Sequence, residues 1–293
     1  MKDRTYDEYR KTVAAFIRWV DGASLDVADD DALDWALVEY AEYSSVTRAE
    51  FGKLLTALRF FRTDLQSGLG AAYAAKAGWS NLVVVRHTVP MLRVFVYGCA
   101  QTFGMRGHSR LAAGLLVQFG AYLRPSELLG LTKRDVVLPE HHAHGTKRRC
   151  YVLLGMRGRT TKVRREQVAE VCGTLSIAAL RWLCRNAASD DTRLVHETYD
   201  EYRKCLLAAA ICMGIPQLGF TPHSPRAGAA TQDIMDDVPF GAVQEYGRWA
   251  HAQSCRMYLD RAKALAVDSV AAGIRFSGLA DNPSRIGAFF ALR

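Results

Sequence analysis

The chain has 293 residues, of which 49% are hydrophobic and 23% are charged, proportions that indicate a folded globular protein and exclude collagen, coiled coil and disorder as overall descriptions. This length suffices for one large domain or two ordinary ones, each with its own core. The formal net charge is +8, but residues 1–80 carry 10 lysines and arginines against 13 acidic residues, whereas residues 81–293 carry 28 against 17.

The first 80 residues predict a small all-helical domain. Thr47 and Glu50 form the T-x-x-E pattern of a capping box, which predicts a helix that starts there and continues to Leu65. Apolar residues recur at helical spacing in three further segments, 9–20, 33–41 and 70–76. A boundary near residues 78–81 is expected, because the charge balance changes there and a new periodic pattern begins.

Residues 81–293 predict a mixed domain that is mainly helical, with a small antiparallel sheet. Pro90 fits the first turn of its first helix. Helical patterns occur in the segments 90–99, 109–120, 175–187, 199–213, 225–235, 240–249 and 252–266. Short β-prone stretches separated by polar turns predict three strands at 135–138, 150–155 and 162–168.

Cysteine usage and hydropathy indicate a protein of a reducing compartment without a membrane span. Seven cysteines are scattered without a CxxC pair, which is typical of small buried side chains in an intracellular protein. The longest uncharged run, 205–225, is interrupted by polar residues and is too short to cross a bilayer. The first residues, MKDRTYDEYRK, lack a following apolar segment, so a secretory signal is not expected.

Familiar signatures of nucleotide-dependent, zinc-dependent and hydrolytic catalysis are missing. The sequence contains no GxxxxGK[ST], GxGxxG, HExxH or GxSxG pattern. A histidine cluster at His141, His142 and His144 lacks the ligand spacing of a known metal site. We therefore expect neither a metal nor a cofactor.

A basic stretch between residues 147 and 165 contains no acidic residue. Such a charge run favours a polyanion, with a solvated basic face as the alternative interpretation. Its eight basic residues are Lys147, Arg148, Arg149, Arg157, Arg159, Lys162, Arg164 and Arg165.

Further basic and aromatic residues lie in four separate segments of the second domain. Arg124 and Glu127 belong to AYLRPSELLGLTKRDV, and Lys162 belongs to the predicted hairpin YVLLGMRGRTTKVRREQ. HSPRAGAATQ contains an H-x-x-R pair, and GRWAHAQSCRMYLD contains a tryptophan nine residues before a tyrosine. In this order and spacing the set resembles the tyrosine recombinase (phage integrase) family, and locally its Cre-type members.

The resemblance implies a two-domain DNA-breaking-rejoining architecture. Residues 1–80 would be a helical core-binding domain that clamps DNA, and residues 81–293 an α/β catalytic domain with a C-terminal tail. It also implies a site-specific recombinase that cleaves and rejoins double-stranded DNA through a 3′-phosphotyrosyl intermediate, without metal or ATP, as a homotetramer on two DNA sites. Such a protein works inside the cell, where DNA is.

The same resemblance assigns a role to each matching residue. Tyr258 would be the nucleophile, Lys162 the general acid and His223 the partner of the tyrosine hydroxyl. Glu127 would orient the basic cluster, and Trp249 would donate to a phosphate oxygen. Arg124 and Arg226 would clamp the non-bridging oxygens, because a guanidinium is always charged and its planar fork of donors suits phosphate.

Other interpretations of these residues stay open. His223 as an ordinary helix N-terminal residue, Lys162 as a hairpin lysine and Trp249 as a core residue are structural alternatives. The tail 278–293, apolar at residues 286, 289, 290 and 292, could dock into a neighbouring subunit or pack on its own domain. A type IB topoisomerase-like relaxase and a catalytically silent DNA-binding protein of recombinase descent are the rival functions.

Overall fold

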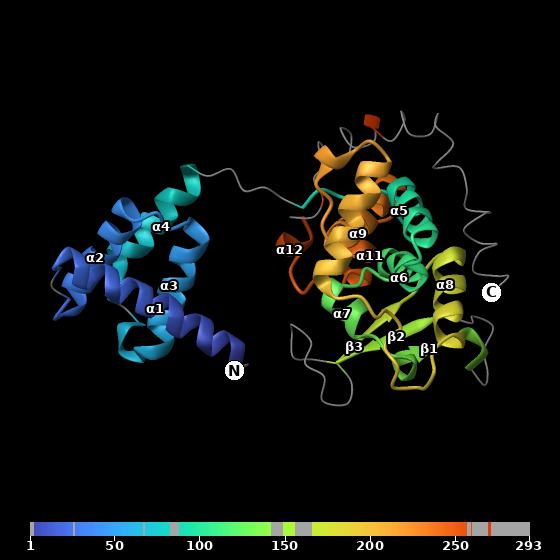
Figure 1. Cartoon of the computed structure of the whole chain (residues 1–293), viewed down its shortest axis with the longest axis horizontal. Helices are drawn as coiled ribbons and strands as arrows, with labels where there is room; N and C mark the ends of the chain where they lie inside the picture. Colours follow the sequence, from blue (N-terminus) through green and yellow to red (C-terminus); the bar gives the residue numbers. More distant parts are fainter. Residues whose placement is uncertain are drawn as a thin grey trace. The chain divides into compact units, whose positions relative to one another are not determined.

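The computed structural model divides into two compact units, residues 1–86 and residues 87–293. Both units are mainly helical, and the second also contains the sheet (Figure 1). The domain boundary expected at residues 80 and 81 lies at the end of a helix of the first unit. The structure describes residues 3–25, 27–66, 68–82, 88–141, 149–155, 166–256, 259 and 269–270.

Four α-helices and a short 3-10 turn build the first unit. They are α1 (Asp3–Ala23), α2 (Asp30–Tyr43), α3 (Arg48–Phe61), η1 (Thr63–Gln66) and α4 (Gly70–Leu82). The predicted capping box is confirmed at the start of α3, where the side chains of Thr47 and Glu50 bond reciprocally to main-chain N–H groups. The predicted helix does not continue to Leu65, because α3 ends at Phe61 and a 3-10 turn follows.

The core of the first unit forms where the apolar faces of its helices meet. Leu37, Phe51 and Leu55 are fully buried in it. A buried carboxylate lies beside these residues: Asp34 of α2 accepts hydrogen bonds from the main-chain N–H groups of Ala71 at 2.7 Å and Ala72 at 2.8 Å. These donors belong to the first turn of α4 and have no acceptor within their own helix. Asp34 therefore joins α2 to α4.

The second unit follows the predicted order of helices, strands and helices. Its elements are α5 (Arg93–Met105), α6 (Ser109–Gly120), α7 (Pro125–Gly130), η2 (Lys133–Asp135), β1 (Val136–Val137), η3 (Pro139–His141), β2 (Tyr151–Leu154), β3 (Gln167–Glu170), α8 (Thr174–Arg185), α9 (Tyr199–Cys212), η4 (Pro216–Leu218), α10 (Ser224–Met235), α11 (Phe240–Tyr246) and α12 (Ala252–Arg256). Helix α6 is buried on nearly every side and packs against α5, α8 and α10.

The strands form one antiparallel sheet in the order β1-β2-β3, at one end of the helical cluster (Figure 1). Val152 in the central strand pairs with Val136 on one side and with Ala169 on the other. All three side chains are buried on the face that joins the core. The third strand covers 167–170 instead of the predicted 162–168, and residues 162–165 lie outside the described part of the chain.

The entry into the second unit differs from the prediction at Pro90. Helix α5 begins at Arg93, so Pro90 precedes the helix instead of lying in its first turn. The physical reason is a main-chain contact with α10: the N–H of Met91 donates to the carbonyl of Ser224 at 3.0 Å. Gly228 allows this approach, because a Cβ atom there would collide with the backbone of Met91.

Two predicted helices near the C-terminus also differ from the structure. The one expected at 240–249 ends at Tyr246, because the following residues turn sharply and Arg248 adopts a positive φ of 57°. The one expected at 252–266 is α12 as far as Arg256, and most of the remainder lies outside the described residues. Within the described part of the chain, no helix is long and apolar enough to span a membrane.

Replacing Gly228 by alanine should lower the free energy of unfolding by about 1–3 kcal/mol, because the added methyl group overpacks the contact with Met91. Thermal unfolding measures the change. Gly241→Ala in α11 is the matched control, since a Cβ atom there meets no neighbour within 4 Å. An unchanged melting temperature for Gly228→Ala would contradict the close approach.

Replacing Asp34 by alanine should destabilise the first unit by about 1–3 kcal/mol, because two main-chain donors lose their acceptor. Hydrogen exchange of the amides of Ala71 and Ala72, together with thermal unfolding, reports the effect. The exposed Glu39 lies on the same helix, so Glu39→Ala controls for loss of an acidic side chain. Equal protection in the two variants would refute the role of Asp34.

Candidate active site

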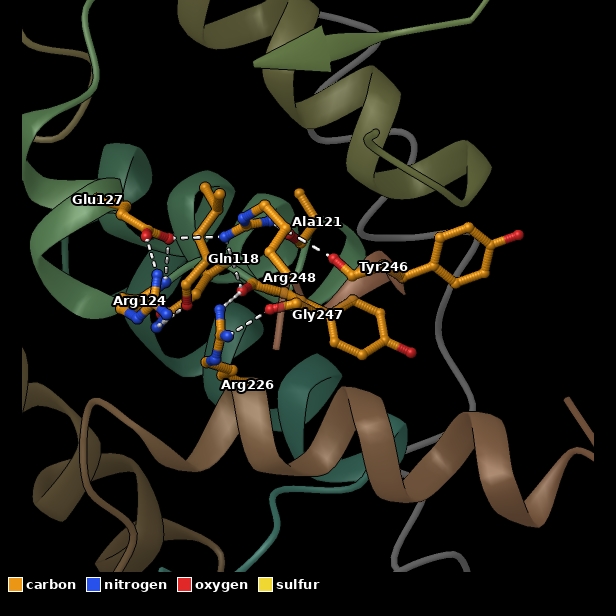
Figure 2. A network of polar contacts seen from close by, with 10 residues as sticks. Gln118, Ala121, Arg124, Glu127, Arg226, Tyr246, Gly247 and Arg248 are labelled. Atoms are coloured by element: carbon orange, nitrogen blue, oxygen red, sulfur yellow. Dashed lines mark hydrogen bonds and ion pairs between the residues drawn. The ribbon is translucent and has the colours of Figure 1, made fainter. Parts of the chain in front are cut away.

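Three arginines from separate segments of the second unit converge on one cluster of acceptors. Arg124 precedes α7, Arg226 lies in the first turn of α10, and Arg248 follows α11. Their side chains approach the Glu127 carboxylate and the main-chain carbonyl of Tyr122 (Figure 2). The first two arginines were predicted as site residues, and the third was not.

Arg124 and Glu127 are held together by the geometry of a helix start. Arg124 is the N-cap residue of α7, and Pro125 occupies the first helical position, where a proline fits without loss of a hydrogen bond. One carboxylate oxygen of Glu127 accepts from the Arg124 main-chain N–H at 2.7 Å, and the other accepts from Nη1 at 2.6 Å. The Arg124 side chain is 16% exposed and that of Glu127 is 7% exposed. Arg124 therefore keeps partial access to solvent.

Arg226 is almost completely buried, with a relative exposure of 1%. Its Nη1 donates to the carbonyl of Tyr122 and its Nη2 to the carbonyl of Gly247 (Figure 2). The guanidinium also lies over the ring of Trp249, 4.6 Å from the centroid, which is a cation–π arrangement. In this structure Arg226 holds the main chain and the indole in place, and its predicted contact with phosphate stays a prediction.

Trp249 lies in the core, which is one of the two interpretations that the sequence left open, and its predicted bond to a phosphate oxygen stays a prediction. Its side chain is 8% exposed and belongs to a small apolar cluster with Tyr122, Val243 and Cys255. The rings of Tyr122 and Trp249 meet edge to face, with centroids 6.2 Å apart. Trp249 is thus a core residue of this cluster and also the aromatic partner of Arg226.

Arg248 is the site residue that the sequence reasoning missed. Its Nη2 donates to Glu127 at 2.8 Å, and its Nη1 donates to the carbonyl of Ala121 at 3.1 Å. The side chain is 7% exposed, and burial lowers its pKa while the Glu127 carboxylate opposes this shift. A signal was present in GRW, where an arginine directly precedes a predicted site residue, but its inward direction depends on the fold.

Tyr122 supports the site through both its main chain and its hydroxyl. It has a positive φ of 51°, a backbone conformation that side-chain-bearing residues rarely adopt. Its hydroxyl donates to the Asp233 carboxylate. Burial and this hydrogen bond raise the pKa of Tyr122, and burial raises the pKa of Asp233. The tyrosine therefore keeps its proton at neutral pH and acts as an anchor between α6 and α10.

His223 occupies the position directly before α10, one turn ahead of Arg226. It is half-buried, and its side chain does not cap the helix.

Helix α12 is attached to the cluster that contains Trp249. Its residue Cys255 is buried in that cluster, and Leu259 packs against the same cluster. Cys255 and Leu259 are thus anchored at the cluster that contains Trp249, the aromatic partner of Arg226.

Several predicted site residues lie outside the described part of the chain. Among the predicted DNA-binding residues, Arg149 is described: it is exposed and its Nη1 forms an ion pair with Glu170 of β3 at 2.8 Å. The predicted catalytic or DNA-binding residues outside the described ranges are Lys147, Arg148, Arg157, Arg159, Lys162, Arg164, Arg165 and Tyr258. A search of the described residues finds no group of three or more histidine, cysteine or acidic side chains that could hold a metal ion.

Comparison with known proteins identifies the fold. No family model and no curated protein sequence matches the chain. The solved structure of XerA recombinase aligns over 92% of both chains with 16% identity and a TM-score of 0.47. That of the XerH site-specific recombinase, bound to its difH substrate in a pre-cleavage complex, aligns over 82% of this chain and 70% of XerH, with 13% identity and a TM-score of 0.53. The fold expected from the sequence is confirmed, because the chain is similar in fold to the XerH site-specific recombinase.

Proposed function

We propose that this protein is a site-specific DNA recombinase that cleaves and rejoins DNA strands through a 3′-phosphotyrosyl intermediate. The convergence of Arg124, Arg226 and Arg248 from three distant segments carries the proposal. It occurs on a fold shared with a recombinase whose solved structure contains its DNA substrate.

The charge balance of the cluster supports a phosphodiester as its substrate. The guanidinium groups of Arg124 and Arg248 contact Glu127, and the guanidinium of Arg226 shares the Tyr122 carbonyl with Arg248. The excess positive charge suits the transition state of phosphoryl transfer, which gathers negative charge on the non-bridging oxygens. Arg124 is the more exposed arginine of the predicted pair, so we assign to it the first contact with the phosphate. The buried Arg226 would stabilise the negative charge of the phosphate through its own positive charge.

The position of α12 supports Tyr258 as the nucleophile. Cys255 and Leu259 contact the aromatic cluster that also contains Trp249, and Trp249 lies against the guanidinium of Arg226. Tyr258 lies between Cys255 and Leu259 in the sequence, so we assign it a place close to the proposed phosphate. The ordinary pKa of a tyrosine hydroxyl is about 10, so nearby positive charge would favour its loss of a proton.

The proposed step exchanges one phosphoester for another. The hydroxyl oxygen of Tyr258 attacks the phosphorus and gives its proton to His223, while the bond from phosphorus to the 5′ oxygen breaks. Lys162 protonates the departing 5′ oxygen, and the 3′ phosphate remains on the tyrosine. The reverse attack by a 5′ hydroxyl rejoins a strand, so no external energy source is needed. We infer a homotetramer on two DNA sites, acting inside the cell.

Replacing Tyr258 by phenylalanine should abolish the covalent protein–DNA adduct on a nicked suicide duplex. DNA affinity should stay within about two-fold, because phosphate contacts dominate binding. Denaturing gel electrophoresis of the labelled duplex measures the adduct. Tyr199→Phe, at an exposed tyrosine of α9, is the control and should form the adduct normally. Adduct formation by Tyr258→Phe would remove this residue as the nucleophile.

Replacing Arg124 by alanine should slow adduct formation by about 10²- to 10³-fold, as loss of a preorganised donor to a developing charge does in other enzymes. Arg124→Lys should retain more activity, although a lysine lacks the planar fork. Arg181→Ala provides the control, because the exposed side chain of Arg181 pairs with Glu140, and within the described part of the chain no hydrogen bond or ion pair joins it to the arginine cluster. A further assay on the parent protein distinguishes the two enzyme activities. A recombinase should exchange strands between two sites, whereas a topoisomerase would only relax a supercoiled plasmid.

A further inference from the structure

We propose that Arg248 is a positioning residue that fixes Arg124 and Arg226 for cleavage, an inference that rests on the proposed function. Arg248 touches a partner of each predicted catalytic arginine without facing solvent itself (Figure 2). It would therefore act on the reaction through these arginines and not by contact with DNA.

The link to Arg124 runs through the Glu127 carboxylate. One oxygen of Glu127 accepts from both the Arg124 main-chain N–H and Arg248 Nη2, and the other accepts from Arg124 Nη1. Arg248 thus holds the same carboxylate that orients Arg124, and it bonds to the oxygen that also accepts from the Arg124 main-chain N–H. Without it, the carboxylate could rotate, and the Arg124 guanidinium would lose its fixed orientation.

The link to Arg226 runs through main-chain carbonyls. Tyr122 O accepts from Arg226 Nη1 and also from Arg248 Nη2 at 3.4 Å. The carbonyl of Gly247, directly before Arg248, accepts from Arg226 Nη2. When Arg248 holds its turn against Ala121 and Tyr122, it also sets the position of the acceptor that orients Arg226.

The backbone conformation at Arg248 is unfavourable by itself, which indicates that the hydrogen bonds of the Arg248 side chain hold it. Arg248 has a left-handed backbone with φ of 57°, which is unfavourable for a residue with a side chain. Its guanidinium is nearly buried, and its Nε has no hydrogen-bond partner among the residues that the structure describes. Gly247 is also constrained, since a Cβ atom there would collide with the Trp249 ring. Backbone strain and desolvation both oppose this arrangement, and the contacts with Glu127 and with the carbonyls of Ala121, Tyr122 and Tyr246 offset them.

The test replaces Arg248 by methionine, which is neutral and of similar length, and measures cleavage, DNA binding and thermal unfolding. We expect a folded protein with DNA affinity close to that of the parent chain. Adduct formation on the suicide duplex should be about 10- to 100-fold slower, because small displacements of catalytic groups have effects of this size. Arg248→Lys should recover part of the rate, since a lysine can reach Glu127 but cannot form the fork to both carbonyls.

A double-mutant cycle separates positioning from general loss of stability. If Arg248 acts through Glu127, the double variant Glu127→Gln/Arg248→Met should be no slower than the slower single variant. It also provides a folded alternative if Arg248→Met unfolds, because the double variant removes the charge of the buried Glu127 together with that of its Arg248 partner. Cleavage by a folded Arg248→Met protein within about three-fold of the parent rate would overturn the proposal, whose expected loss is at least ten-fold.

A measurement that does not depend on cleavage distinguishes this proposal from the proposed function. Arginine-selective ¹⁵N NMR should show a sharp Nε–Hε signal for Arg124 in the parent chain, assigned with Arg124→Lys. The signal should broaden in Arg248→Met, because the guanidinium gains freedom of rotation. Absence of cleavage by the parent chain would refute the proposed function. An unchanged Arg124 signal in Arg248→Met would refute the positioning role, whether or not the parent chain cleaves DNA.

Discussion

The candidate site depends on the ability of a few acceptors to hold like charges close together. Arg124, Arg226 and Arg248 repel one another, and each is kept in place by hydrogen bonds to Glu127 or to main-chain carbonyls. These acceptors are available because the chain turns sharply after α6, where Tyr122 has a left-handed backbone and leaves its carbonyl directed at two guanidinium groups. A strained turn therefore supports an electrostatically unfavourable cluster.

The rest of the second unit fixes the segments that meet at this turn. Helix α6 is buried among α5, α8 and α10, so its C-terminal end has little freedom. The hydroxyl of Tyr122 bonds to Asp233 of α10, and Trp249 and Cys255 fill the space beside it. Tyr122 and Trp249 belong to the apolar cluster and also contact Arg226, so the apolar cluster and the arginine cluster are directly connected.

Sequence patterns predicted the features that depend on local chemistry. Thr47 and Glu50 identified a helix start, and alternating β-prone segments identified the three-stranded sheet. Features set by distant contacts were not predicted: Pro90 lies outside α5 because Met91 bonds to Ser224, and Arg248 points inward because it bonds to Glu127 and to the carbonyl of Ala121. Arg124, Glu127, Arg226 and Trp249 were predicted as neighbours from the family resemblance, whereas spacing alone could not have joined segments a hundred residues apart.

The main chain at Met91 packs against the first turns of α10. This contact determines where a shortened protein that contains only the second unit can begin. The residues before α5 cover Gly228 and satisfy the carbonyl of Ser224, two positions of the helix that carries Arg226. An excised second unit that began at Arg93 would uncover this helix at its N-terminal turn. Fragments intended to retain the arginine cluster must therefore start upstream of Met91, although that segment contains no residue of the cluster itself.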